Sequence, residues 1–196
     1  FILSGFVKAV DPLGTQYKIV DYLKAMQLGT FVPDFLTLTA SVLLSAVEFG
    51  LGICMLFAIR RRLVSLLALC MMIPMTALTL WLAVANPVTD CGCFGDAVTL
   101  TNWQTFTKNV VLLGCAAIVR YRPLDMMRFV SKTNQWIVTN YSMLFIFAVS
   151  AWSLYDLPQF DFRPYHVGTN ILKGMEIPEG AEMPTFETTY LMEKDG

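Results

Sequence analysis

The chain has 196 residues, of which 56% are hydrophobic and only 15% are charged. Soluble globular domains carry roughly 25% charged residues, so this composition, with a mean hydropathy of +0.57, indicates an integral membrane protein in contact with the lipid bilayer. The formal net charge of −1 gives no basic excess, and nucleic acid is therefore excluded as a partner.

Apolar segments recur along the first 155 residues. The chain opens inside one of them, residues 1–7, which we interpret as the outer half of a first transmembrane helix rather than the remnant of a signal peptide. A helix needs about 20 apolar residues to cross a hydrocarbon core of about 30 Å. Four longer segments of about this length predict further transmembrane helices: residues 35–59, 63–85, 103–119 and 136–155. The helix over 63–85 should be kinked at Pro74.

Lysine and arginine are unevenly distributed among the predicted links. Residues 60–62 are all arginine, and the link after the fourth segment carries Arg120, Arg122, Arg128 and Lys132. Loop 86–102 contains no lysine or arginine, whereas the link 11–34 has two lysines, Lys18 and Lys24. The positive-inside rule therefore places the two arginine-rich links in the cytoplasm, and it places loop 86–102, link 11–34 and the C-terminal tail outside.

We expect the helical bundle to occupy residues 1–155. Two more polar regions occur in the chain, one within the bundle and one after it. Residues 11–29 predict an amphipathic helix in the outer interface, with Tyr17, Val20 and Leu23 on its apolar face, or else an ordinary loop helix. Residues 156–196 form an acidic, proline-containing tail, and its alternating segment 185–192 predicts a β-strand. We interpret this tail as the start of a further extracytoplasmic domain. His166, the single histidine, is expected to be a surface residue.

The most informative segment is residues 86–96, NPVTDCGCFGD, in the loop predicted to lie outside. Cys91 and Cys93 flank one glycine, and a disulfide across one residue is strained, which raises its reduction potential. The pair is compatible with thiol–disulfide chemistry, with Asp90 and Asp96 as proton acceptors. It is also compatible with a small structural disulfide or two free thiols in a tight turn. A metal site is disfavoured, because no histidine lies nearby to complete the coordination.

The three other cysteines lie deep in the predicted helices. Cys54, Cys70 and Cys115 are about 28, 22 and 18 Å from the outer helix ends at 1.5 Å per residue, too far to meet the outer pair. They are predicted to be small apolar packing residues. Electrons from any dithiol chemistry would therefore leave through a partner protein or a small carrier such as a quinone.

Glu48 is the one acidic residue within a long apolar segment, about 20 Å from the outer end of its helix. An intramembrane carboxylate is a candidate functional site, and the other possibility is a protonated side chain hydrogen-bonded to Ser45, Thr76 or Thr79. Lys8 and Asp11, three residues apart at the end of the first segment, are expected to form a local ion pair.

The segment from Asp90 to Asp96, leading into the fourth helix, resembles the Cys-Gly-Cys-Phe-Gly signature of MauE-type membrane proteins. The opening, from Ser4-Gly5 through Lys8 to Asp11-Pro12, is similar to the first-helix motif of the broader DoxX family. Together the two motifs bracket residues 1–119. The chain looks most like the DoxX-like membrane proteins of Bacteroidetes that carry an outward C-terminal extension.

This resemblance implies an all-α transmembrane fold with a four-helix core laid out like the vitamin K epoxide reductase-like bundle. The further helix and the polar tail are not part of the short MauE pattern and are predicted from this chain alone. The resemblance also implies a role for Cys91 and Cys93 in making or maintaining disulfides, as MauE does for methylamine dehydrogenase. The sequence thus predicts a multi-pass protein of the bacterial inner membrane that performs or supports thiol–disulfide redox, with a periplasmic thiol protein as partner. The alternatives are a non-catalytic subunit or assembly factor of a membrane complex, and a proton-coupled transporter that uses Glu48.

Overall fold

The computed structural model describes residues 1–26, 32–85, 100–123 and 126–156, all within one compact unit. Most of these residues are helical, and none of them forms a strand. Their elements, in chain order, are α1 (Ile2–Val10), α2 (Pro12–Ala25), α3 (Asp34–Leu56), α4 (Arg61–Ala85), α5 (Asn102–Tyr121), the short 3-10 helix η1 (Lys132–Asn134) and α6 (Gln135–Tyr155). The predicted transmembrane helices thus all form as helices, with ends within a few residues of the expected positions.

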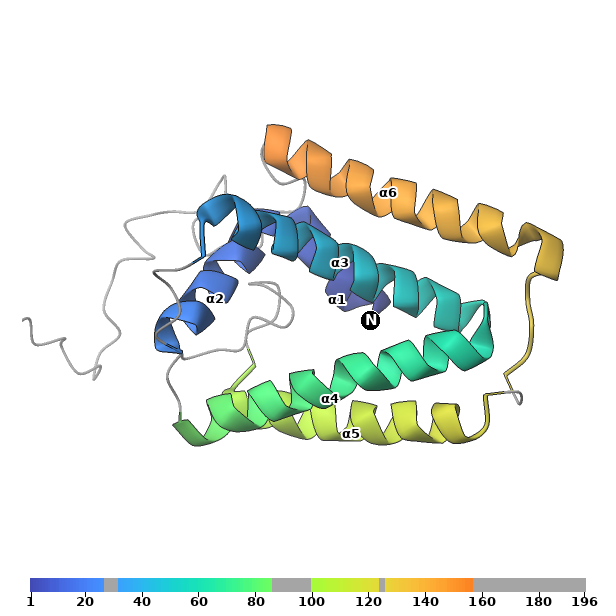
Figure 1. Ribbon diagram of the computed structural model, residues 1–196, viewed down its shortest axis with the longest axis horizontal. Coiled ribbons are helices and arrows are strands. Elements are labelled where there is room, and N and C mark those ends of the chain that lie inside the picture. Colours follow the sequence, from blue (N-terminus) through green and yellow to red (C-terminus); the bar gives the residue numbers. More distant parts are fainter. Residues whose placement is uncertain (27–31, 86–99, 124–125, 157–196) are drawn as a thin grey trace, which may run out of the picture. The chain divides into compact units, whose positions relative to one another are not determined.

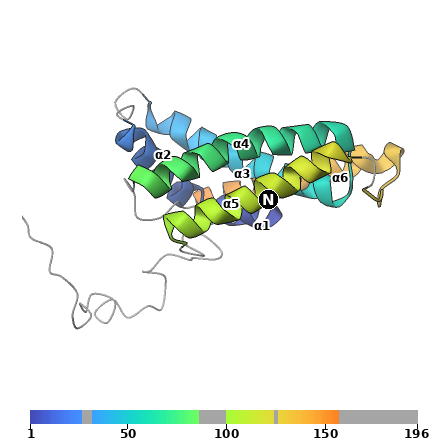
Figure 2. The same ribbon diagram turned by 90° about the horizontal axis from the view of Figure 1, so that it is seen from below.

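Helix α3 organises the bundle, because it contacts α1, α2, α4 and α6 (Figure 1). Helices α4 and α5 form an antiparallel pair along most of their length (Figure 2). A small apolar core joins α1, α3 and α6 through Ala9, Ala46, Phe49 and Ile146. Many large apolar side chains on the outer helix faces remain exposed, as expected for helices that face lipid.

Three helices of the described part are long and apolar enough to cross a membrane: α3, α4 and the η1–α6 segment Lys132–Tyr155. Helix α5 has 20 residues but includes Lys108 and Arg120, and it does not reach the same hydropathy. Three of the expected spans are therefore confirmed by length and composition. Spans through α1 and α5 stay predictions.

Local sequence signals account for several helix ends. Pro12 begins α2, and the Asp11 side chain accepts a hydrogen bond of 2.9 Å from the Gly14 amide. Thr101 and Gln104 form the capping box that begins α5. Pro74 lies inside α4, where it removes one backbone donor.

The helix expected within residues 11–29 forms as α2, whereas its place in the membrane interface stays a prediction. Pro12, Thr15 and Gln16 are the buried residues of α2, whereas Tyr17 is 64% exposed. The Gln16 amide donates to the Asp34 carbonyl at 3.0 Å and to the Thr37 hydroxyl at 3.1 Å. Helix α2 is thus attached to α3 by polar contacts, because the α3 N-terminus offers acceptors there.

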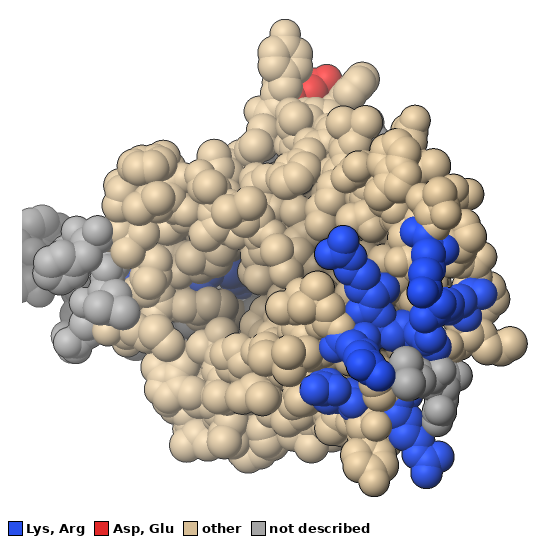
Figure 3. Space-filling model, turned by 45° about the vertical axis from the view of Figure 1, so that its right-hand side comes forward, with Lys and Arg blue, Asp and Glu red and all other residues tan. Residues whose placement is uncertain are grey.

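The arginine-rich links lie at one end of the bundle. Helices α3 and α5 end there, and α4 and α6 begin there (Figure 1). Viewed from that side, the lysines and arginines gather in one region of the surface (Figure 3). The Arg61 guanidinium donates to the Met126 carbonyl at 2.7 Å and so joins the two links. We call this region the basic end, made of residues 60–62, Arg120, Arg122, Arg128 and Lys132.

The tail from residue 157 onward lies outside the described residues. The predicted strand 185–192, His166 and the proposed further domain therefore stay predictions. The same holds for the polar loop between α4 and α5, of which residues 86–99 are outside the described part.

Candidate functional site

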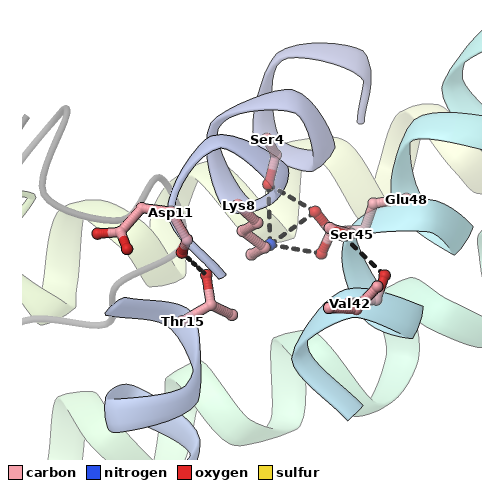
Figure 4. Close-up of polar contacts among 7 residues, drawn as sticks. All are labelled: Ser4, Lys8, Asp11, Thr15, Val42, Ser45 and Glu48. Atoms are coloured by element: carbon pink, nitrogen blue, oxygen red, sulfur yellow. Dashed lines mark hydrogen bonds and ion pairs between the residues drawn. The ribbon is translucent and has the colours of Figure 1, made fainter. Parts of the chain in front are cut away.

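The described part contains one buried ion pair, between Lys8 of α1 and Glu48 of α3. The Lys8 ammonium nitrogen lies 2.6 Å from both carboxylate oxygens of Glu48. Ser4 donates a hydrogen bond of 2.7 Å to the same carboxylate, and Lys8 donates one of 3.0 Å to the Ser4 hydroxyl. The three side chains point toward one another between the two helices (Figure 4). Both charged side chains are only 4% exposed.

The close approach of α1 to α3 creates this geometry. A Cβ atom on Gly5 would lie 2.5 Å from the Phe49 amide nitrogen and 2.8 Å from the Ser45 carbonyl oxygen. One on Gly52 would lie 2.7 Å from the Ile2 amide nitrogen. These glycines let the backbones meet, as small residues do in membrane helix pairs. Ser4 and Lys8, four residues apart, then share the α1 face that meets Glu48.

Forming the Lys8–Glu48 pair changes the free energy of folding little, whereas removing one partner alone costs much stability. Burying two charges is expensive, and their attraction with supporting hydrogen bonds offsets that cost only when the geometry is good. Here the carboxylate is engaged by the ammonium and by a hydroxyl, so both charges are well compensated. Removal of one partner would leave the other charge buried and uncompensated, which costs about 3–5 kcal/mol. Neither Lys8 nor Glu48 can therefore be removed alone without a large loss of stability.

A small cavity adjoins the pair. It has a volume of about 60 Å³, and α4 and α5 line its far side with Met72, Met75, Lys108 and Asn109. Asn109 also donates to the Thr79 hydroxyl at 3.2 Å, which links α5 to α4 at this depth. Such a volume holds a few water molecules but is far below the roughly 300 Å³ or more of a pocket for a larger organic ligand. A quinone ring therefore does not fit beside Lys8 in this arrangement.

The structure corrects the expected ion pair between Lys8 and Asp11. Lys8 binds Glu48, and Asp11 points away from it (Figure 4). The Asp11 carboxylate caps α2 instead, where it accepts from the Gly14 amide. The reason is that α1 ends at Val10, so the i, i+3 geometry of one continuous helix does not extend to Asp11.

The expected hydrogen-bond partners of Glu48 are also wrong. Ser45 donates to the Val42 carbonyl at 2.8 Å, and Thr76 donates to the Met72 carbonyl at 2.7 Å. Thr79 likewise donates to carbonyl groups of its own helix. Each hydroxyl therefore satisfies a backbone acceptor within its own helix. The partners of Glu48 come from α1, about 40 residues earlier in the chain.

The predicted redox residues Asp90, Cys91, Cys93 and Asp96 lie outside the described residues. The ends of the helices that flank them are described, at Ala85 for α4 and Asn102 for α5. Both ends lie at the side of the bundle opposite the basic end (Figure 1). The pairing and surroundings of the two cysteines stay predictions.

The three helical cysteines are free, as expected. Cys54 is partly buried, but Cys70 and Cys115 are exposed on the outer faces of α4 and α5. The expectation that all three pack inside the bundle is thus wrong for Cys70 and Cys115. Within the described residues, no group of three or more histidine, cysteine or acidic side chains could hold a metal ion.

Sequence reasoning missed Ser4, Lys108 and Asn109 as residues around the buried pair. A signal for Ser4 was present, because a polar residue four positions before Lys8 shares its helix face. Lys108 was a visible charge within an apolar helix, although the side of α5 on which it lies could not be assigned from its own segment.

Residues 1–122 match a family model described as "Methylamine utilisation protein MauE". The matched range includes the buried pair, the cavity-lining residues of α4 and α5, and the segment with Cys91 and Cys93. No curated protein and no solved structure gives a significant match to the chain.

Proposed function

The chain belongs to the MauE family, and from this premise we propose that it supports disulfide formation at the outer face of a bacterial inner membrane through Cys91 and Cys93. The observation that carries the proposal is the family match over residues 1–122, which includes a pair of cysteines separated by a single glycine. A one-residue spacing strains a disulfide and makes it a better oxidant than a structural disulfide.

In the proposed reaction, the Cys91–Cys93 disulfide oxidises a dithiol of an exported protein. A substrate thiolate attacks one sulfur, a substrate–enzyme disulfide forms, and the other cysteine leaves as a thiolate. The second substrate thiolate then displaces the enzyme sulfur. The substrate loses two electrons and two protons and gains a disulfide, while Cys91 and Cys93 become thiols. Asp90 and Asp96 would accept the protons of the substrate thiols and pass them to the Cys91 and Cys93 thiolates.

Turnover requires a two-electron acceptor. A quinone that takes up two electrons and two protons to become a quinol would restore the disulfide, as would a partner protein with its own disulfide. The 60 Å³ cavity beside Lys8 is too small for a quinone ring, so the buried ion pair is not assigned to this step. We assign to Lys8 and Glu48 the positioning of α1 on α3.

The proposed orientation has the basic end in the cytoplasm. Seven lysines and arginines lie in the links at that end, whereas loop 86–102 has none. The positive-inside rule then directs the loop with Cys91 and Cys93 to the oxidising periplasmic side, where disulfides persist. Helix α6 ends at Tyr155, at the same end of the bundle as the end of α4 and the start of α5 (Figure 1), and on this basis we direct the C-terminal tail outside as well.

Thiol trapping tests the proposal directly. Membranes carrying the protein, Cys91→Ser or Cys93→Ser are quenched with acid and alkylated, and proteins linked to the chain by disulfides are separated without reductant. One of the two single variants should accumulate a mixed disulfide with a substrate, and both should lose oxidation of a reduced dithiol peptide. Cys70→Ser, which changes an exposed helical cysteine, is the matched control and should behave like the parent protein.

If both variants oxidise the peptide normally and trap nothing, the cysteines only shape the loop. The non-catalytic subunit or assembly factor then becomes the better account.

A second candidate function, a proton-coupled transporter, is favoured by one observation, namely a buried carboxylate beside a cavity. It predicts that Glu48→Gln abolishes proton-driven uptake into vesicles, whereas the redox proposal predicts unchanged peptide oxidation in any Glu48→Gln protein that folds.

A further inference from the structure

A groove lies over α3 at the basic end, between α4 and α6. Its volume is about 550 Å³, which is within the range of about 300–1,000 Å³ typical of ligand pockets. It is distinct from the cavity beside Lys8, with which it shares no lining residue. The groove does not include the loop with the cysteine pair, and nothing in the redox proposal uses it.

The two cations that line the groove lie at one of its ends, whereas apolar residues line it along its length. Arg60, Lys132 and Gln135 line it where α4 and α6 begin. Leu67 and Met143 line it further along, six residues after the start of α4 and eight after the start of α6, which is about 9 and 12 Å at 1.5 Å per residue. One end of the groove therefore suits a polar group, and the other suits hydrocarbon.

The polar end lies within a strong excess of positive charge. Residues 57–62 and 120–136 contain seven lysines and arginines and one acid, Asp125. The figure viewed from this side shows the cations gathered over the ends of these helices (Figure 3). Trp136, which also lines the groove, is 62% exposed and belongs to the residue type that favours the level of lipid headgroups.

We propose that this groove binds an anionic phospholipid of the cytoplasmic leaflet, with its phosphate between Arg60 and Lys132 and an acyl chain along Leu67 and Met143. Basic pockets between transmembrane helices on the cytoplasmic side are suited to anionic headgroups. The apolar part of the groove is continuous with exposed leucines on α4, Leu63 and Leu67, which are 46% and 45% exposed. A membrane lipid therefore supplies both parts of the ligand, whereas a free phosphate ion supplies only one.

Trp136 offers a probe inside the groove. A protein with Trp81, Trp103 and Trp152 replaced by phenylalanine keeps Trp136 as its single tryptophan. It is reconstituted into phosphatidylcholine vesicles that contain a minor fraction of brominated lipid, either phosphatidylglycerol or phosphatidylcholine. Bromine quenches a nearby tryptophan. We expect Trp136 to be quenched several-fold more efficiently by the brominated phosphatidylglycerol at equal lipid fraction.

Single charge variants distinguish lipid binding in the groove from a general attraction of anionic lipid to the basic end. Arg60→Gln and Lys132→Gln should each reduce the preference about fivefold, since a cation near the surface contributes about that factor to binding an anionic lipid. Arg62→Gln removes an exposed cation of the same end that does not line the groove, and it should leave the preference nearly unchanged. Circular dichroism of each reconstituted variant checks that the helices are intact.

Two further measurements identify the ligand source. Inorganic phosphate added to the vesicles should not compete with the brominated phosphatidylglycerol, and competition would overturn the lipid assignment. A protein with Trp152 as its single tryptophan, near the other end of α6, should show no preference between the two lipids. Equal quenching of Trp136 by both lipids, or an equal loss in Arg62→Gln, would overturn the proposal, because the preference would then be absent or not specific to the groove.

Discussion

The buried pair predicts a strong thermodynamic coupling between Lys8 and Glu48. Lys8→Met leaves Glu48 almost fully buried, with Ser4 as its remaining partner at 2.7 Å. Breaking a buried pair in this way costs about 3–5 kcal/mol, and 4 kcal/mol corresponds to a change of about a thousand-fold in the unfolding equilibrium constant. Glu48→Met should cost a similar amount, because it leaves the Lys8 ammonium buried.

The double variant Lys8→Met/Glu48→Met should be much more stable than either single variant. It removes both charges together, and replacement of a buried pair by apolar side chains of similar size is often neutral or stabilising by about 1–4 kcal/mol. The two single losses therefore should not add, and the coupling free energy should be about the sum of the two single losses or more.

Detergent-driven unfolding of the purified protein, followed by circular dichroism, measures these free energies. Lys24→Met is the matched control, because Lys24 is an exposed lysine of α2, and it should change the free energy of unfolding by about 0.5 kcal/mol or less. If Lys8→Met is no more destabilising than Lys24→Met, the pair does not hold α1 on α3 and the reasoning fails. The same conclusion follows if the double variant loses the sum of the two single losses.

Three other predictions concern packing, capping and topology. Gly5→Ala should destabilise the bundle by about 1–3 kcal/mol in the same assay, because its Cβ would meet the backbone of α3. Gly114→Ala, with open space at its Cβ, should instead stabilise α5 by up to about 1 kcal/mol, and an equal effect of both changes would refute the close-packing argument. Thr101→Ala should lower the free energy of unfolding by about 1 kcal/mol because the capping box is lost, while Thr101→Ser should retain most of that stability. In a protein whose five native cysteines are replaced by alanine, a membrane-impermeant thiol reagent should label Arg62→Cys from the cytoplasmic side alone, and labelling from outside would reverse the proposed orientation.

The helices could be predicted from the sequence because each is encoded by its own segment. Apolar runs of sufficient length specify α3, α4 and α6, and the arginine links mark where the chain reverses. The capping box of Thr101 is likewise a local signal, since its two partners are three residues apart. Helix α5 packs along α4 but is less apolar than α3, α4 and α6, so its own sequence does not establish it as a span.

The partners of Lys8 and Glu48 could not be predicted in the same way. Lys8 and Glu48 are 40 residues apart in the sequence. Asp11, which is only three residues from Lys8, was the more obvious partner by local spacing. The decision depends on where α1 ends and on the glycines that let α1 approach α3, and both are properties of the packed bundle. The inward face of α2 was missed for a related reason. Its Gln16 is buried because the α3 N-terminus, at Asp34 and Thr37, supplies acceptors for the amide.

The most direct test of the central claim is the redox equilibrium of Cys91 and Cys93 in native membranes. Replacement of the three free helical cysteines, Cys54, Cys70 and Cys115, by alanine leaves these two as the reporting thiols. Membranes are equilibrated with buffers of defined potential and quenched, and the thiols are alkylated with a mass tag. The account predicts a single two-electron transition well above about −300 mV, the range below which structural disulfides typically lie. A transition below that value, or two thiols that never form a disulfide, would contradict it.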